Sequence, residues 1–292
     1  MLLFLQTTVS GILNGMNYVL LALGLTLTFG IGRVINFAHG EFYMLGAFVA
    51  LLAVNNLHAP YLLSLVIAAV AIAALGAVTN RLFVMPVQRK ESSIWAPFLV
   101  TLALMIIFQS LALLVFGPDP QILESPYANQ SVAFGQIRLS QQDIVSVALA
   151  ALVSVGLVLL LKRTRLGIAM RAVAKDPETA SLMGIENQHI KSLTFALGTG
   201  LAAFAGVLVL PQSVLDPYVG RMALLKGLTI VILGGLGNVN GAILSGILFG
   251  LAEAYGAVYI SVGFEDAIGY LLMIIVLLFL PQGIISQKTR WG

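Results

Sequence analysis

The chain has 292 residues, of which 59% are hydrophobic and only 9% are charged. Charged residues make up about a quarter of an ordinary soluble domain, so this composition excludes a soluble globule and predicts a polytopic membrane protein. The absence of cysteine excludes disulfides, thiolate metal ligands and a cysteine nucleophile. The net charge of +3 arises from basic residues that lie beside apolar runs, which indicates membrane orientation rather than nucleic-acid binding.

Apolar runs follow one another along the chain, and none shows the alternation of membrane strands. We predict an all-α fold, a single transmembrane domain over residues 1–292 with about eight or nine spans of roughly 20 residues. The predicted spans are 8–31, 37–54, 61–84, 95–116, 143–161, 192–212, 224–237, 241–261 and 266–281. Because the run from Asn36 contains His39 and Glu41, and 224–237 is short, one or two segments should be broken or re-entrant.

Basic residues set the expected orientation, because short loops rich in Lys and Arg stay in the cytoplasm. They gather in 81–90, in the long polar stretch 163–191 and in the tail 288–290, whereas the loop 117–142 is poor in them and should lie outside. Nine crossings would put the N-terminus outside and the C-terminus inside. Eight crossings with a re-entrant segment would move one terminus.

Small residues recur at four-residue spacing within two predicted spans. Such faces let helices approach closely in lipid, and we interpret both as packing surfaces. They consist of Ala242, Gly246, Gly250 and Ala254 in one span and of Gly198, Ala202 and Gly206 in the other.

The stretch 163–191 contains a predicted short helix over 177–183. The run Asp176-Pro177-Glu178 has the signals of a helix start, because Asp caps free N–H groups, Pro needs no donor at the first position and Glu suits the positive end of the dipole. Gly184 can adopt the left-handed conformation that ends a helix.

This predicted helix carries Ala180, Leu182 and Met183. An apolar face on a two-turn helix in a basic loop indicates a docking partner, and the alternative is a helix that lies on the lipid surface. Arg171 and Lys175 precede it and belong to the same candidate site.

The sequence lacks the patterns G-x-x-x-x-G-K-[ST], H-E-x-x-H and G-x-S-x-G, so we predict neither an enzyme nor a nucleotide site within this chain, and we assign no metal ligands. Coupled carriers usually need ionisable residues in the membrane core, and we assign only Glu41 and Glu253 to it, with His39 beside the first. Glu41 should line a polar path or pair with Arg33. Glu253 should form hydrogen bonds between helices.

Two glycine-broken segments are similar to each other, although chance is an alternative explanation. Gly24-Leu25-Thr26 precedes the first break and Gly227-Leu228-Thr229 precedes the second. Paired segments of this kind point to the substrate path of a transporter. We predict that both break within the membrane and that their backbone groups line a polar path. The predicted path residues are Asn36, His39, Gly40, Glu41, Gly234, Gly235, Gly237 and Asn238.

The pattern Glu178-Thr179-Ala180-x-x-x-Gly184 resembles the E-A-A-x-x-x-G loop of ABC importer permeases. The stretch Gly30–Phe48, with its run N-F-A-H-G-E, resembles a segment of branched-chain amino acid permeases of the LivH kind. Shorter likenesses to that family are F-G-P at 116–118, R-L-G at 165–167, L-M-G-I at 182–185, L-G-G-L-G-N at 233–238 and P-Q-G at 281–283.

The resemblance implies a multi-pass permease subunit of an importer in the bacterial inner membrane. Its implied partners are a second related permease subunit, two ATP-binding subunits, a periplasmic solute-binding protein and membrane lipid, with no nucleic acid. ATP would be bound by the partner subunits, and this chain would need no cofactor. The coupling residues that the resemblance implies are Arg171, Lys175, Asp176, Pro177, Glu178, Ala180, Leu182, Met183 and Gly184. Two alternatives stay open: a permease of the same family for urea or short amides, and a standalone secondary transporter or channel.

Overall fold

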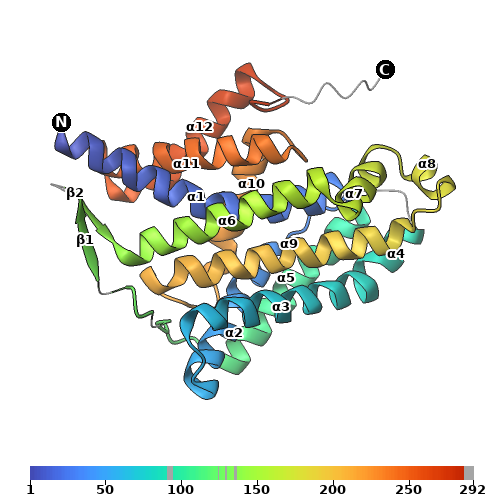
Figure 1. Cartoon of the computed structure of the whole chain (residues 1–292), viewed down its shortest axis with the longest axis horizontal. Coiled ribbons are helices and arrows are strands. Elements are labelled where there is room, and N and C mark those ends of the chain that lie inside the picture. The colour runs from blue at the N-terminus through green and yellow to red at the C-terminus, as the bar shows by residue number, and fades with distance from the viewer. Residues whose placement is uncertain (91–94, 124, 129, 135–136, 286–292) are drawn as a thin grey trace.

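The computed structural model describes residues 1–285 apart from 91–94, 124, 129 and 135–136, and it describes no side chains for 133–138. The predicted basic tail, with Lys288 and Arg290, lies outside the described residues. Helices run side by side through the body of the protein (Figure 1). This arrangement confirms the all-α prediction, and the described residues add a small two-stranded sheet in the loop after the fourth span.

The elements differ from the predicted spans mainly at their ends. A π-helical turn joins α3 to α4, so these two helices form one continuous run. In chain order the elements are α1 (Leu2–Gly30), α2 (His39–Leu57), α3 (Tyr61–Thr79), η1 (Asn80–Val84), α4 (Met85–Lys90), α5 (Trp95–Phe116), β1 (Ser131–Phe134), β2 (Ile137–Ser140), α6 (Gln141–Arg163), α7 (Arg165–Lys175), α8 (Pro177–Leu182), α9 (Asn187–Val209), η2 (Leu210–Gln212), α10 (Val219–Gly234), α11 (Val239–Tyr259), η3 (Val262–Phe264) and α12 (Glu265–Phe279).

Within the described residues, eight helices are long and apolar enough to cross a membrane. The additional short helix α10 has 16 residues and overlaps the predicted span 224–237, so the expectation of a short segment there is confirmed. α4, α7 and α8 lie at one end of the bundle, and the N-terminus and the β1–β2 hairpin lie at the other (Figure 1). We call these the basic end and the opposite end.

The chain between α1 and α2 is not helical, and α2 starts deep inside the bundle. The His39 ring forms a hydrogen bond with the carbonyl oxygen of Leu21, at 3.1 Å. Leu21 lies before the end of α1 by roughly 13 Å at 1.5 Å per residue. The stretch 31–38 therefore brings the chain from the basic end back to mid-depth, which makes α2 the broken span that the sequence predicted.

α1 lies at the centre of the bundle and contacts α6, α9, α10 and α11. A Cβ atom added at Gly15 would lie 2.8 Å from the carbonyl oxygen of Gly246, and one added at Gly250 would collide with Gly11 and Gly15. The small-residue face of α11 therefore packs on α1, as predicted. The face of α9 is also a packing surface, because a Cβ at Gly198 would lie 2.8 Å from the carbonyl oxygen of Gly24.

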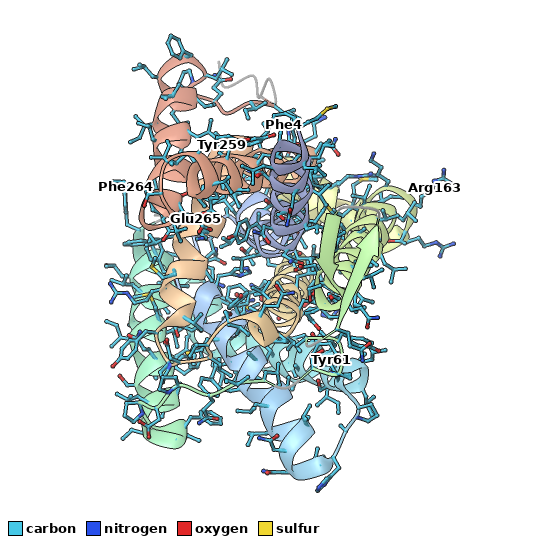
Figure 2. The ribbon with its side chains drawn as sticks, turned by 90° about the vertical axis from the view of Figure 1, so that its left-hand side faces the viewer. Phe4, Tyr61, Arg163, Tyr259, Phe264 and Glu265 are labelled. Atoms are coloured by element: carbon cyan, nitrogen blue, oxygen red, sulfur yellow. The ribbon has the colours of Figure 1, made fainter. Side chains whose placement is uncertain are left out.

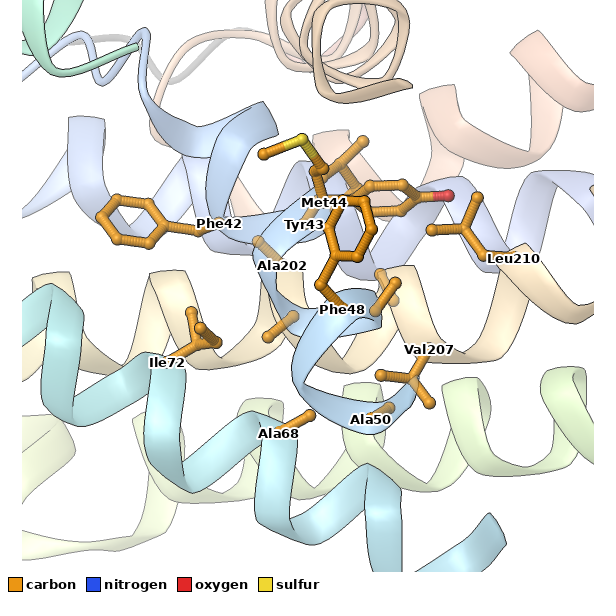
Figure 3. Close-up of a cluster of buried hydrophobic side chains, with 14 of the residues drawn as sticks. Phe42, Tyr43, Met44, Phe48, Ala50, Ala68, Ile72, Ala202, Val207 and Leu210 are labelled. Carbon is orange, nitrogen blue, oxygen red and sulfur yellow. The ribbon is translucent and has the colours of Figure 1, made fainter. Parts of the chain in front are cut away.

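Large apolar side chains of α2 pack in a core that is shared with α3, α5 and α9. Phe42 and Phe48 are almost completely buried there (Figure 3). The ring of Phe42 packs against Phe108 of α5 and Phe195 of α9, and the ring of Phe48 stacks on Phe116 of α5. Because α2 is buried over its first half, its starting point cannot shift without disturbing these neighbouring helices.

A buried amide near the opposite end connects α3, α6 and α9. The Nε2 atom of Gln142 donates to the hydroxyl of Tyr61 at 2.9 Å and to the carbonyl oxygen of Leu208 at 3.0 Å. Its Oε1 atom accepts from Ser125 at 2.7 Å. Since the amide donates and accepts within the protein, this network is structural.

The glycine contact between α1 and α11 is testable with a matched control. Gly250→Leu should reduce stability by about 1–3 kcal/mol, because the new side chain overlaps α1 backbone. Gly156→Leu places the same side chain on α6, where nothing lies within 4 Å, and should be neutral or stabilising. For both variants, the measurement is the temperature at which half of the protein in detergent is no longer monodisperse. Equal losses in the two variants would contradict the packing assignment.

Candidate functional site

The predicted coupling helix is present and has well-formed ends. The carboxylate of Asp176 accepts hydrogen bonds from the backbone N–H groups of Glu178 and Thr179, at 3.0 and 3.1 Å. The Thr179 hydroxyl donates to the same carboxylate, and these bonds hold the pKa of the Asp176 carboxyl below its usual range. The cap therefore stays charged at neutral pH. Gly184 adopts φ +83° and ends the helix, as the sequence predicted.

Three further hydrogen bonds close the end of this helix and fix it in place. The N–H of Ile185 donates to the carbonyl oxygen of Ala180, and that of Gly184 to Ser181, which is the Schellman pattern of a helix end. The side chain of Asn187, in the first turn of α9, donates to the carbonyl oxygen of Pro177 at 2.6 Å. The short helix is thus attached rigidly to a long one.

The apolar face of α8 is divided, and this corrects one expectation. Leu182 and Met183 are 87% and 79% exposed, so both are free to meet a partner. Ala180 is only 4% exposed and packs inward against the core that includes Val173. Ala180 is therefore a structural contact, because a two-turn helix presents opposite sides at positions two apart. Arg171 and Lys175 are exposed on α7 at the same end.

The first group of predicted path residues lies at mid-depth, at the start of α2. Asn36, His39 and Glu41 are each at most 1% exposed. Asn36 Oδ1 accepts from the backbone N–H of Ala38, but its Nδ2 atom has no hydrogen-bond partner in the described protein. His39 Nδ1 and both carboxylate oxygens of Glu41 also lack partners there. Three polar side chains with unused hydrogen-bonding atoms are therefore grouped around one helix start.

The second group of predicted path residues lies at the basic end. A Cβ at Gly30, the last residue of α1, would lie 3.0 Å from Gly237. Asn238 caps α11 by accepting from the N–H of Gly241 at 3.0 Å, and its amide donates to the carbonyl oxygen of Ile285. A surface depression of about 290 Å³ borders Gly235 and Asn238. The two breaks thus lie at different depths, and Asn238 has a structural role that the sequence did not reveal.

The expected pairing of Glu41 with Arg33 is wrong. The stretch 31–38 carries Glu41 away from the basic end, whereas Arg33 stays there and acts electrostatically on Asp176. The cation that acts on Glu41 is Arg221, in the first turn of α10. A Cβ added at Gly220 would lie 3.1 Å from Glu41 Oε2, so the carboxylate packs directly against that turn.

The expectation that Glu41 and Glu253 are the ionisable residues of the membrane core overlooked Lys226 of α10. Lys226 Nζ lies 2.9 Å from Glu253 Oε1 and 2.8 Å from Asp266 Oδ1. It also donates to the hydroxyl of Tyr18 at 3.1 Å. Glu253 therefore connects helices, as predicted, but through an ion pair. The sequence signal was a lysine within the predicted apolar span 224–237.

This ion network holds the start of α12 to the bundle. Seen from the opposite end, α12 extends away from the other helices, with Phe264 and Glu265 at its beginning (Figure 2). Only 6% of the apolar run Val262–Phe279, which includes α12, is buried. Asp266 is in its first turn and Gly269, one turn later, packs against the ring of Phe249. Charge pairing and the glycine contacts at Gly269 and at Gly256, which packs against Ile268, thus anchor a helix that buries little apolar surface.

Hydrogen bonds to the non-helical stretch reveal another residue that sequence reasoning missed. Thr101 of α5 is fully buried, and its hydroxyl donates to the carbonyl oxygen of Ile35 at 3.0 Å and accepts from the N–H of Phe37 at 3.2 Å. Gln88 donates to the carbonyl oxygen of Gly32. A lone threonine in an apolar span gave no signal that it supports the start of α2.

Comparison with known proteins places the chain in a family. The family model described as "Branched-chain amino acid transport system / permease component" matches residues 7–280. The chain is 34% identical to the high-affinity branched-chain amino acid transport system permease protein LivH of Escherichia coli (strain K12), over 98% of this chain and 96% of that protein. It is 33% identical to the corresponding protein BraD of Pseudomonas aeruginosa, over 97% and 96%.

An archaeal protein is also similar. The probable branched-chain amino acid transport permease protein LivH of Methanocaldococcus jannaschii is 30% identical, over 91% of this chain and 87% of that protein. No solved structure matches. The matched residues extend from α1 to the end of α12 and so include the starts of α2 and α10 and the whole of α8. The chain is a multi-pass membrane protein that belongs to the permease family of branched-chain amino acid transport systems.

Proposed function

We propose that this protein is the membrane-spanning permease subunit of an ABC importer that passes branched-chain amino acids across the bacterial inner membrane. The observation that carries the proposal is α8, a capped helix at the basic end that exposes Leu182 and Met183. It occurs in a chain 34% identical to a permease of branched-chain amino acid transport. A rigid helix with an apolar exposed end suits docking to another protein.

Energy for transport comes from other subunits in this proposal. The sequence has no G-x-x-x-x-G-K-[ST] loop, which a chain needs to cradle nucleotide phosphates by this mechanism. Two ATP-binding subunits would bind ATP and press on α8. A second related permease subunit would complete the membrane domain, and a periplasmic solute-binding protein would deliver the amino acid. This chain would then act as a conduit without a cofactor of its own.

The start of α2 supports a polar path at mid-depth. Hydrogen-bonding atoms of Asn36, His39 and Glu41 have no partner in the described protein, although all three side chains are buried. Buried polar atoms without partners are rare in structural positions. A passing ammonium or carboxylate group could use such atoms once the path opens. The turn at Gly234, Gly235, Gly237 and Asn238 would lie at the cytoplasmic mouth of that path.

Reconstitution of the complete importer tests the substrate. In proteoliposomes with the ATPase subunits, the second permease and the solute-binding protein, we expect ATP-dependent uptake of leucine, isoleucine and valine. Urea and acetamide should not compete when present in a hundredfold excess. Uptake of urea without uptake of leucine would assign the protein to another substrate, and uptake without ATPase subunits would indicate a standalone transporter.

Substitutions on α8 test the docking role. Leu182→Glu and Met183→Glu should reduce leucine uptake at least tenfold, because a charge at a desolvated contact costs about 1.4 kcal/mol or more. Their ATP hydrolysis should no longer respond to the loaded solute-binding protein. Ser181→Ala, at an exposed neighbour, is the control and should behave as wild type. Normal coupled transport by both glutamate variants would exclude docking through this helix.

A further inference from the structure

α10 presents one exposed face that contains an arginine. Tyr218, Met222 and Leu225 are 50%, 47% and 48% exposed, and Arg221 is exposed between them. The positions follow the spacing i, i+3, i+4 and i+7, so they share one side of the helix. Three members have large apolar or aromatic side chains, and the fourth has a fixed positive charge.

This arginine lies at mid-depth along the bundle, far from the basic end. A Cβ at Gly220 would lie 2.6 Å from the carbonyl oxygen of Gly40, which is next to His39 at mid-depth. From Arg221 to Gly234, at the basic end, the helix extends for roughly 20 Å at 1.5 Å per residue. An arginine facing lipid near the bilayer centre costs at least about 2.5–3.5 kcal/mol. The exposed face therefore meets water or protein rather than hydrocarbon.

The surroundings of Arg221 favour a ligand that carries a carboxylate. Glu41 is 1% exposed, and its carboxylate has no hydrogen-bond partner among the described residues but interacts electrostatically with Arg221. This carboxylate lies behind the exposed face and offsets the charge of the arginine from the protein side. No ion pair within 4.0 Å joins the two in the described protein, so the five donors of the guanidinium are free to bind a second carboxylate.

We propose that Arg221 is a solute-binding residue of the transport path, which binds the carboxylate of the amino acid while Tyr218, Met222 and Leu225 contact its apolar side chain. The inference rests on the proposed function, because it assigns a contact for the same solute. It is carried by the position of a charged side chain on an exposed helix face at mid-depth, next to a buried carboxylate without a hydrogen-bond partner in the described protein. Bidentate binding by arginine suits a carboxylate better than the point charge of lysine does.

Cysteine labelling tests whether this face lines an aqueous path, and the chain has no native cysteine. In the assembled importer, Arg221→Cys and Leu225→Cys should react with a membrane-impermeant anionic methanethiosulfonate. Leu278→Cys, at a 76% exposed position of α12, should not react. Failure of both α10 positions to react would overturn the proposal. Reaction of both positions in the separately purified chain, with no reaction in the assembled importer, would make the face a permease–permease interface and would also overturn the proposal.

Uptake assays test the contact itself. Arg221→Gln should reduce leucine uptake about ten- to hundredfold, since hydrogen bonds to a charged group are lost. Leucine uptake by Arg221→Lys should lie between that of Arg221→Gln and that of the wild type. Both complexes should elute as assembled particles, which separates loss of binding from loss of folding. Unchanged uptake by Arg221→Gln would overturn the proposal. If the wild-type importer does not transport leucine, the proposed function fails, but the labelling result still decides whether the face is a path.

Discussion

The stretch 31–38 must satisfy its backbone hydrogen bonds inside the membrane region, and much of the structure follows from how it does so. Unpaired peptide groups in a bilayer cost several kcal/mol each, so a non-helical segment there needs partners from neighbouring helices. Thr101 and Gln88 provide side-chain partners, and Asn36 caps the N–H of Ala38. These contacts fix where α2 begins. They therefore also fix the depth of His39 and Glu41.

Close helix packing allows this arrangement. Gly24 gives room to the His39 ring, and a Cβ at that position would lie 2.7 Å from it. Gly220 lets the first turns of α2 and α10 meet backbone to backbone. Helix starts carry a partial positive charge from free N–H groups, so two of them beside Glu41 favour a negative group at this point. Small residues thus determine both the helix contacts and the electrostatic character of the region around Glu41.

The sequence predicted what depends on local signals. The ends of α8 were predictable because Asp176, Pro177 and Gly184 act on their own backbone, and the apolar runs located the spans. The depth of a residue along the bundle and the direction in which its side chain points were not predictable in the same way. A glycine-rich run can form a mid-depth break or a turn at a bundle end, and only packing against Gly30 places Gly237 at the end. Arg221 and Lys226 were missed because apolar neighbours dominate their run, and the inward side of Ala180 depends on tertiary contacts.

The buried pairing of Lys226 has a consequence for how the protein enters the membrane. Its partners Glu253 and Asp266 follow it in the sequence and belong to α11 and α12. While α10 is alone in the bilayer, the lysine has no counter-charge and its insertion costs roughly 2.5–3.5 kcal/mol. α12 in turn buries little surface without that lysine. The last three helices therefore depend on one another during biogenesis, and a chain truncated after α10 would leave that lysine without either counter-charge.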